Sequence, residues 1–197
     1  MSEIPIHVCS LPQGKILADL ESVANDLRLV VDITQRLVTG EKDTLLLRSL
    51  FCAGLITYRR CFNSGVRNSI KREDLGIAFQ GKAVETHDYL MAQANKLVAH
   101  SVNPFERTQT GVLVRDEKVI GISTLSAQII LFDESQMEQW HRLSKLTLEN
   151  VLLPRIEDAR RIALEAVGQL PIQDITRQPI LEYDPVIPSE RAGDRRP

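Results

Sequence analysis

A long run of regularly spaced apolar residues between Lys15 and Thr39 constrains the fold more than any other feature of the chain. The apolar side chains recur mostly at steps of three and four residues; they are Ile16, Leu20, Val23, Leu27, Val30, Val31 and Leu37. That spacing places them along one face of an α-helix, and Gly40 supplies a stop. The sequence therefore predicts a long amphipathic helix at the start of the folded part.

Further helices are expected in the first half of the chain. A second helix should cover about 44–63, with Asp43 or Thr44 as its N-cap. It is apolar on more than one face, which indicates a central position in a bundle. A short helix is expected around 74–79. A third long helix is expected over about 86–101, ending before the next proline.

The second half of the chain begins with the signature of a β-hairpin, at about 111–125. Two apolar runs flank the polar run 115–118, although this turn lacks the favoured Asn-Gly pair. Asp133 with Gln136 resembles a capping box and opens a fourth helix. Pro154 is suited to begin a new helix that ends at Gly168. The predicted fold class is all-α: a four- to five-helix bundle with a small β-hairpin insertion.

The chain divides into one domain and two irregular ends. Residues 1–13 contain two prolines and should form an irregular arm. The helical domain with its hairpin is expected over 14–170, and one domain fits a length of 197 residues. Residues 171–197 are rich in proline and poor in core-forming residues, so they are expected to be an extended or disordered tail.

Composition argues against several classes of protein. With a formal net charge of −2, any nucleic-acid site must be a local patch. No apolar run approaches the roughly 20 residues of a membrane helix, and no secretory signal is evident, so a cytoplasmic location is expected. The cysteines and histidines lack metal-ligand spacing, and the glycines form no phosphate-binding pattern. No metal and no cofactor is therefore predicted.

The third helix carries the candidate chemistry. Lys96 and His100 are four residues apart, hence on one helical face, and Asn95 precedes them. A histidine can move a proton near neutral pH, and a cation beside it could stabilise the transition state of metal-independent RNA cleavage. The alternative, which spacing alone favours, is that His100 caps the C-terminus of the helix and opposes its dipole.

The segment 94–101 resembles the signature of HEPN-domain proteins, an all-helical bacterial and eukaryotic family. Its ribonuclease members carry an arginine, usually a polar residue next, and a histidine four to six residues after the arginine. Here Asn95 matches the polar position, His100 matches the histidine, and Ala94 stands where the arginine would be. The resemblance covers roughly 15–170, but its specific part is this short motif.

The resemblance implies a two-fold homodimer in which two such helix ends form one cleft. It also implies an endoribonuclease that cuts single-stranded RNA without a metal, in a bacterial defence or toxin–antitoxin setting. Alanine at position 94 removes a charge-assisted partner for phosphate, and losing such a donor costs about 2.7–4 kcal/mol at the transition state. Either another cation substitutes, or the domain binds RNA and no longer cuts it. The second interpretation is favoured, and whether the protein is an enzyme stays open.

A basic segment offers substitutes for the missing arginine, because no acidic residue occurs between Asp43 and Glu73. Cations and aromatic residues alternate there: Arg48, Phe51, Tyr58, Arg59, Arg60, Phe62, Arg67, Lys71 and Arg72. One interpretation is an RNA-binding patch of Arg59, Arg60 and Arg67 with Tyr58, in which Arg59 or Arg60 replaces the guanidinium beside His100. The other is a solvated helix face whose charges pair with Glu73, Asp74 or the tail.

Two further features, at 140–142 and in the tail, concern binding and not catalysis. Trp140 and His141 could stack on bases, but a core position for Trp140, with His141 and Arg142 in solvent, is the simpler interpretation. The alternative function is a helical homodimer acting as a protein-interaction module through its bundle surface and its Pro-rich tail, with an antitoxin-like partner on the tail. A small-molecule pocket inside the bundle is neither supported nor excluded.

Overall fold

The computed structural model describes residues 5–40, 43–62, 68–79, 81–98, 106–128 and 132–181. These residues are mostly helical, with one antiparallel two-stranded hairpin. The elements in chain order are α1 (Pro12–Val38), α2 (Thr44–Phe62), α3 (Arg72–Ala78), α4 (Ala83–Gln93), the π-helix η1 (Ala94–Val98), β1 (Glu106–Arg115), β2 (Lys118–Gln128), α5 (Glu134–Thr147), the π-helix η2 (Leu148–Leu152), α6 (Leu153–Gly168) and α7 (Ile172–Thr176). Within the described ranges, no helix has the length and apolar character needed to cross a membrane.

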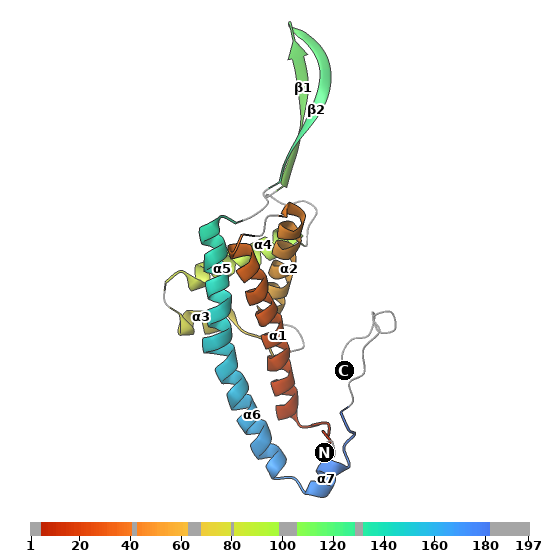
Figure 1. Ribbon diagram of the computed structural model, residues 1–197, viewed down its shortest axis with the longest axis vertical. Helices are drawn as coiled ribbons and strands as arrows, with labels where there is room; N and C mark the ends of the chain where they lie inside the picture. Colours follow the sequence, from red (N-terminus) through yellow and green to blue (C-terminus); the bar gives the residue numbers. More distant parts are fainter. Residues whose placement is uncertain are drawn as a thin grey trace.

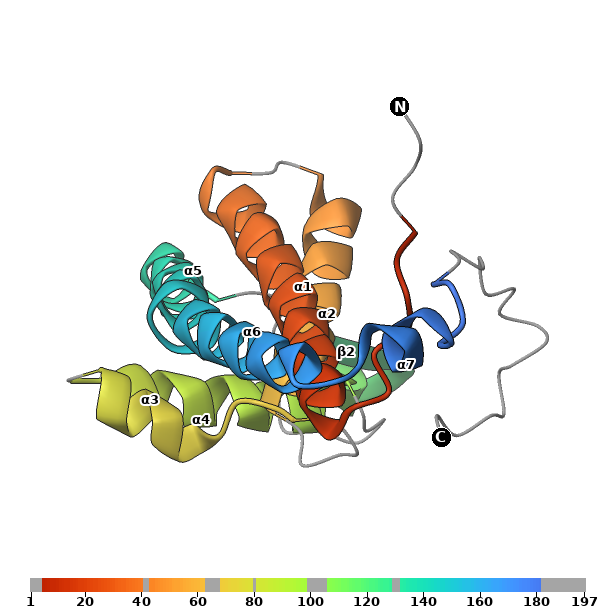
Figure 2. The ribbon, with the colours of Figure 1, turned by 90° about the horizontal axis from the view of Figure 1, so that it is seen from below.

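Helix α1 lies at the centre of the helical body, where it packs against α2, α5 and α6. Figure 2 shows it between α2 on one side and the α5–α6 pair on the other. Its buried apolar side chains follow the predicted spacing: Leu20, Val23, Ala24, Leu27, Val30, Ile33 and Leu37. The predicted amphipathic helix is therefore confirmed. It begins earlier than expected, at Pro12, because proline is well accommodated in the first turn of a helix.

An aromatic cluster joins α2 to α5. Trp140 is fully buried, and its ring centroid lies 5.8 Å from those of Phe51 and Phe132 and 6.4 Å from that of Tyr58. Gly54 lies opposite this ring, since a Cβ atom built on it would be 2.8 Å from Cη2 of Trp140. The absence of a side chain at Gly54 thus lets α2 approach α5 closely, and the core position predicted for Trp140 is confirmed.

Both predicted helix caps are present. The backbone nitrogen of Leu46 donates to the Asp43 carboxylate at 2.9 Å, which caps α2. At the start of α5, Gln136 N donates to Asp133 Oδ1 at 2.8 Å and Asp133 N donates to Gln136 Oε1 at 3.0 Å. This reciprocal pair is the capping box that the sequence predicts.

The helical run from α5 to α6 is continuous, and Figure 1 shows it as one long rod along the body. Pro154 lies in the first turn of α6, as expected, but it does not separate two helices. The five-residue π-helix η2 leads directly into α6. Pro154 removes one helical hydrogen bond, and the rod changes its hydrogen-bond pattern immediately before it.

The N-terminal arm is joined to the segment that follows α6. Val8 N donates to the carbonyl of Pro179 at 2.8 Å, and Nδ1 of His7 lies 2.9 Å from the carbonyl oxygen of Gln178. The sequence predicts an extended or disordered tail from residue 171, whereas the structure has α7 there and brings it beside the N-terminal arm (Figure 2). Residues 182–197 lie outside the described part of the chain.

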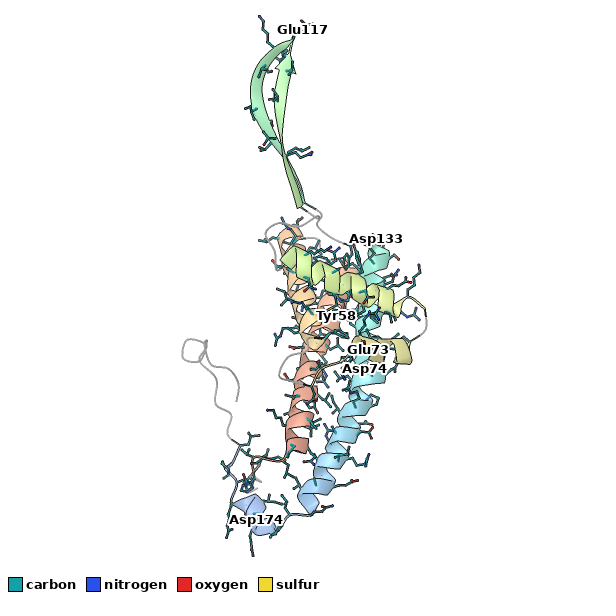
Figure 3. The ribbon with its side chains drawn as sticks, turned by 180° about the vertical axis from the view of Figure 1, so that it is seen from behind. Tyr58, Glu73, Asp74, Glu117, Asp133 and Asp174 are labelled. Carbon is teal, nitrogen blue, oxygen red and sulfur yellow. The ribbon has the colours of Figure 1, made fainter. Side chains whose placement is uncertain are left out.

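Strands β1 and β2 form a hairpin that extends past one end of the helical body (Figure 1). This hairpin is called the arm below, and residues 5–11 are always called the N-terminal arm. It covers 106–128 and so exceeds the expected 111–125. Its turn has positive φ at both central residues, 48° at Asp116 and 61° at Glu117, the backbone of a type I′ turn. Figure 3 labels Glu117 at the tip. No described helix packs extensively against either strand.

Candidate functional site

The predicted catalytic motif lies only partly within the described residues. Asn95 and Lys96 belong to η1, where Asn95 is half-buried and Lys96 is exposed. Ala94, the position at which the HEPN signature has arginine, is 2% exposed and belongs to the core. Alanine therefore suits the packing at this position, where a guanidinium group would be buried. His100 lies outside the described residues.

Two cations of the basic segment are neutralised by acids from other helices. Nη2 of Arg60 lies 3.4 Å from Oδ1 of Asp26 on α1. Arg72 donates two hydrogen bonds to Asp88 on α4, at 2.7 and 2.6 Å. Arg59 is half-buried, and Arg67 lies outside the described residues. Where the structure describes them, these charges fit the solvated-face interpretation better than a single patch, although the acids are not those that the sequence suggested.

Tyr58 belongs to the core. Its side chain is fully buried, and its hydroxyl lies 3.1 Å from Nδ1 of His87, which is 4% exposed (Figure 3). Burial raises the pKa of the Tyr58 phenol well above its usual value, so this group is neutral. The placement of Tyr58 among RNA-contacting residues is therefore corrected, because its ring has no exposed face on which a base could stack.

We expect the protein to lose stability as the pH falls below about 6.5, through His87. Burial lowers the pKa of the His87 imidazole below the usual histidine value of about 6.5. The folded state then binds fewer protons than the unfolded state, so the contribution of His87 is complete above that value and declines below it. Urea midpoints at about pH 7.5 and about pH 5.5 measure this decline.

The variant His87→Gln keeps a polar group beside Tyr58 but cannot take up a proton in this range. Its urea midpoint should change less with pH than that of the wild type. The matched control is Gln93→Asn, at a buried polar position of the same helix that carries no titratable group, and it should retain the wild-type pH dependence. Equal pH dependence in the wild type and His87→Gln would contradict the assignment.

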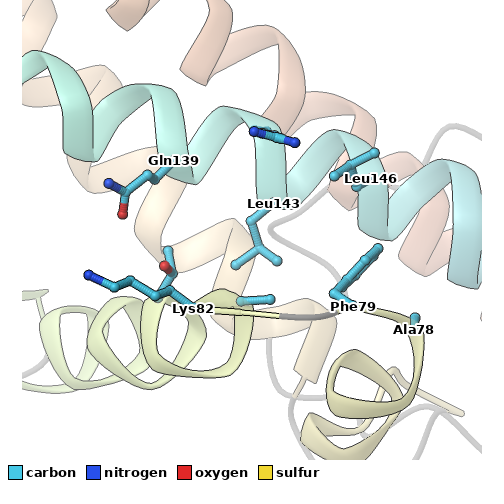
Figure 4. Close-up of a pocket in the computed structure, with 9 residues that line it drawn as sticks. Ala78, Phe79, Lys82, Gln139, Leu143 and Leu146 are labelled. Carbon is cyan, nitrogen blue, oxygen red and sulfur yellow. The ribbon is translucent and has the colours of Figure 1, made fainter.

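A groove of about 410 Å³ lies beside α4 and α5, near the end of α3 (Figure 4). Phe79, Leu143 and Leu146 form an apolar part, and Lys82 and Arg142 are cations in the same lining. A second hollow of about 200 Å³ shares Lys82 with the first. Sequence reasoning missed this groove because Lys82 and Arg142 are sixty residues apart in the chain.

The two apolar runs that predict the hairpin turn out to be exposed on the arm, which the sequence analysis did not anticipate; their large side chains are Val112, Leu113, Val114, Val119, Ile120, Ile122 and Leu125. Val112 pairs with Ile122 and therefore shares one face of the hairpin with it, whereas Leu113 lies on the other face. The sequence does contain a signal for two apolar faces, namely the three successive apolar residues at 112–114. A strand with only one buried face would alternate apolar and polar residues.

No family model, curated protein or solved structure matches this chain. The resemblance to HEPN domains therefore rests on the short motif at 94–101. Among the described residues, no group of three histidine, cysteine, aspartate or glutamate side chains could hold a metal ion. The arm and the groove are two features of the described part whose exposed side chains are available for binding.

Proposed function

We propose that the protein is a self-associating interaction module, with the arm as its main contact surface. The observation that carries this proposal is the apolar character of both faces of the arm, where Val114 is 63% and Ile122 is 73% exposed. A two-stranded hairpin alone is marginally stable in water, and monomers rarely expose large contiguous apolar patches. Burial of the arm against a second surface would stabilise the hairpin and would remove its apolar side chains from water.

The size of the arm favours a second copy of the chain as the partner. A strand of 10 residues spans about 33 Å, and a ribbon about 10 Å wide then presents roughly 330 Å² on each face. A stable interface needs about 800 Å² from each partner. One arm docked on an unrelated protein falls short of this area. In a two-fold interface in which each arm packs on the body of the other copy, each partner contributes one face of its arm and a matching area of its body, roughly 660 Å² in all, which approaches that area.

The charges of the arm are compatible with pairing to itself. The turn contains Arg115, Asp116, Glu117 and Lys118, whose formal charges cancel. No charged residue and no proline occurs in 108–114 or 119–128. Natural proteins use lysine, proline or other charges to stop edge strands from pairing, and both edges of this hairpin lack them along most of their length. Two arms can therefore approach without like-charge repulsion.

Apolar surface near the base of the arm would extend this interface. Leu45, in the first turn of α2, is 76% exposed. In Figure 1 the start of α2 lies at the end of the helical body from which the arm extends. The packing of α1 with α2, α5 and α6 also supports the proposal that the body is the expected four- to five-helix bundle.

The proposal is tested by light scattering coupled to size exclusion at about 20 μM protein. The wild type should be a dimer, and Ile122→Asp/Leu125→Asp, which puts a charge on each face of β2, should be a monomer. The matched control is Leu164→Asp, an equally exposed apolar residue on α6, and it should remain dimeric. A monomeric wild type, or a dimeric double variant, would contradict the proposal.

A second proposal concerns RNA and rests on the exposed Lys96 beside Asn95 in η1. π-Helical turns are frequent at functional sites, and a homodimer of this chain would contain two such turns. Because position 94 is alanine, we expect single-stranded RNA to be bound and not cut.

The RNA proposal predicts binding that weakens steeply with salt, and a smaller salt slope for Lys96→Gln. If the wild type does cut RNA, His100→Ala should abolish cutting, which tests the catalytic role of His100. The matched control for Lys96→Gln is Arg72→Gln, which should keep the wild-type salt slope because Arg72 is already paired with Asp88. Absence of binding at low salt, or a Lys96→Gln slope equal to that of the wild type, would refute this proposal.

A further inference from the structure

We infer that the groove beside α4 and α5 binds an organic acid with an apolar body. The groove has about 410 Å³, which lies in the range of small-molecule sites. In Figure 4, Lys82 and Gln139 lie at one end, and Phe79 and Leu146 lie at the other. The two ends therefore match the two parts of such a ligand. This inference does not depend on the proposed self-association.

The charges of the groove select an anion. Neither Lys82 nor Arg142 forms an ion pair with another described residue, and none of the residues that line this groove is acidic. Neighbouring cations do have acidic partners: Arg72 pairs with Asp88, and Nη1 of Arg155 lies 2.9 Å from Asp74. The groove thus combines two cations from different helices with no acid of its own, an arrangement that attracts a carboxylate.

The apolar lining selects the rest of the ligand. Leu143 is buried at the centre of the groove, with Phe79 and Leu146 half-buried beside it. A neutral apolar ligand would displace water from the two cations and offer them no hydrogen-bond acceptor in its place, which costs free energy. A small inorganic anion would leave the apolar part uncovered. An acid with an apolar body satisfies both parts, and the side chain of Gln139 adds a hydrogen-bond donor near Lys82.

The test compares octanoate with 1-octanol, two probes of the same chain length that differ in charge. Isothermal titration calorimetry on the full chain should show octanoate binding with a dissociation constant below about 1 mM and much weaker binding of 1-octanol. Lys82→Gln/Arg142→Gln should weaken octanoate binding by about tenfold or more. The matched control is Lys145→Gln, an exposed cation on α5 outside the groove lining, which should bind octanoate like the wild type.

Amide chemical shifts locate the site independently of the variants, because octanoate should perturb the amides of Phe79, Leu143 and Leu146. The inference is overturned if octanoate does not bind, if 1-octanol binds equally well, or if the double variant binds as tightly as the wild type. The oligomeric state of Lys82→Gln/Arg142→Gln, measured by light scattering, should equal that of the wild type. Loss of octanoate binding is therefore distinguishable from failure of the arm-mediated dimer.

Discussion

Replacing Trp140 by alanine is expected to lower the free energy of unfolding by about 3–5 kcal/mol. The indole is fully buried and contacts the rings of Phe51, Tyr58 and Phe132. Its removal opens a cavity between α2 and α5 that the surrounding helices can only partly fill. Trp140 is the only tryptophan of the chain, so urea unfolding is best followed by far-ultraviolet circular dichroism.

Two further variants make this expectation specific to the buried indole. Trp140→Phe should cost much less, because phenylalanine keeps most of the apolar volume and removes Nε1, which has no hydrogen-bond partner among the described residues. Tyr89→Ala serves as the control, since Tyr89 contacts the same cluster through Phe132 but is half-exposed. A loss for Trp140→Ala no greater than that for Tyr89→Ala would mean that the indole does not organise this core.

The features that sequence reasoning predicted correctly are those fixed by short-range chemistry. The spacing of apolar residues in α1 determines which face is buried, whatever that face meets. The caps at Asp43 and Asp133 involve side chains and backbone within three residues of each other. In the same way, the hairpin follows from two β-branched runs around a polar turn, although the turn uses Asp116 and Glu117 in place of Asn-Gly.

The features that were missed depend on residues far apart in the chain. The expected α-helix over 86–101 changes to the π-helix η1 at Ala94, and the side chain of Ala94 packs in the core. The tail forms α7 and bonds to the N-terminal arm, a contact that no local pattern could reveal. Tyr58 resembled part of a basic, aromatic surface, yet its ring faces inward towards His87. The groove was missed for the same reason, because its lining combines residues of α4 and α5, which are far apart in the chain.

Gly54→Ala is expected to destabilise the protein by about 1–3 kcal/mol, although alanine is the better helix former. On helix propensity alone, this change within α2 would add roughly 0.5–1 kcal/mol of stability. The added Cβ, however, would lie 2.8 Å from Cη2 of Trp140 and 3.1 Å from Cγ2 of Ile33. Both neighbours belong to buried side chains that cannot move away without disturbing the core. Urea unfolding measures the difference.

Gly76→Ala is the matched control, because Gly76 is also helical, but the nearest atom to its added Cβ is 3.7 Å away. It should be slightly stabilising through helix propensity, so the effects of the two glycine variants on the free energy of unfolding are expected to have opposite signs. Combining Gly54→Ala with Trp140→Phe should restore part of the loss, since the smaller ring makes room for the methyl group. If Gly54→Ala is stabilising, α2 and α5 are not held at close approach through this glycine, and the aromatic cluster then tolerates a wider separation of the two helices.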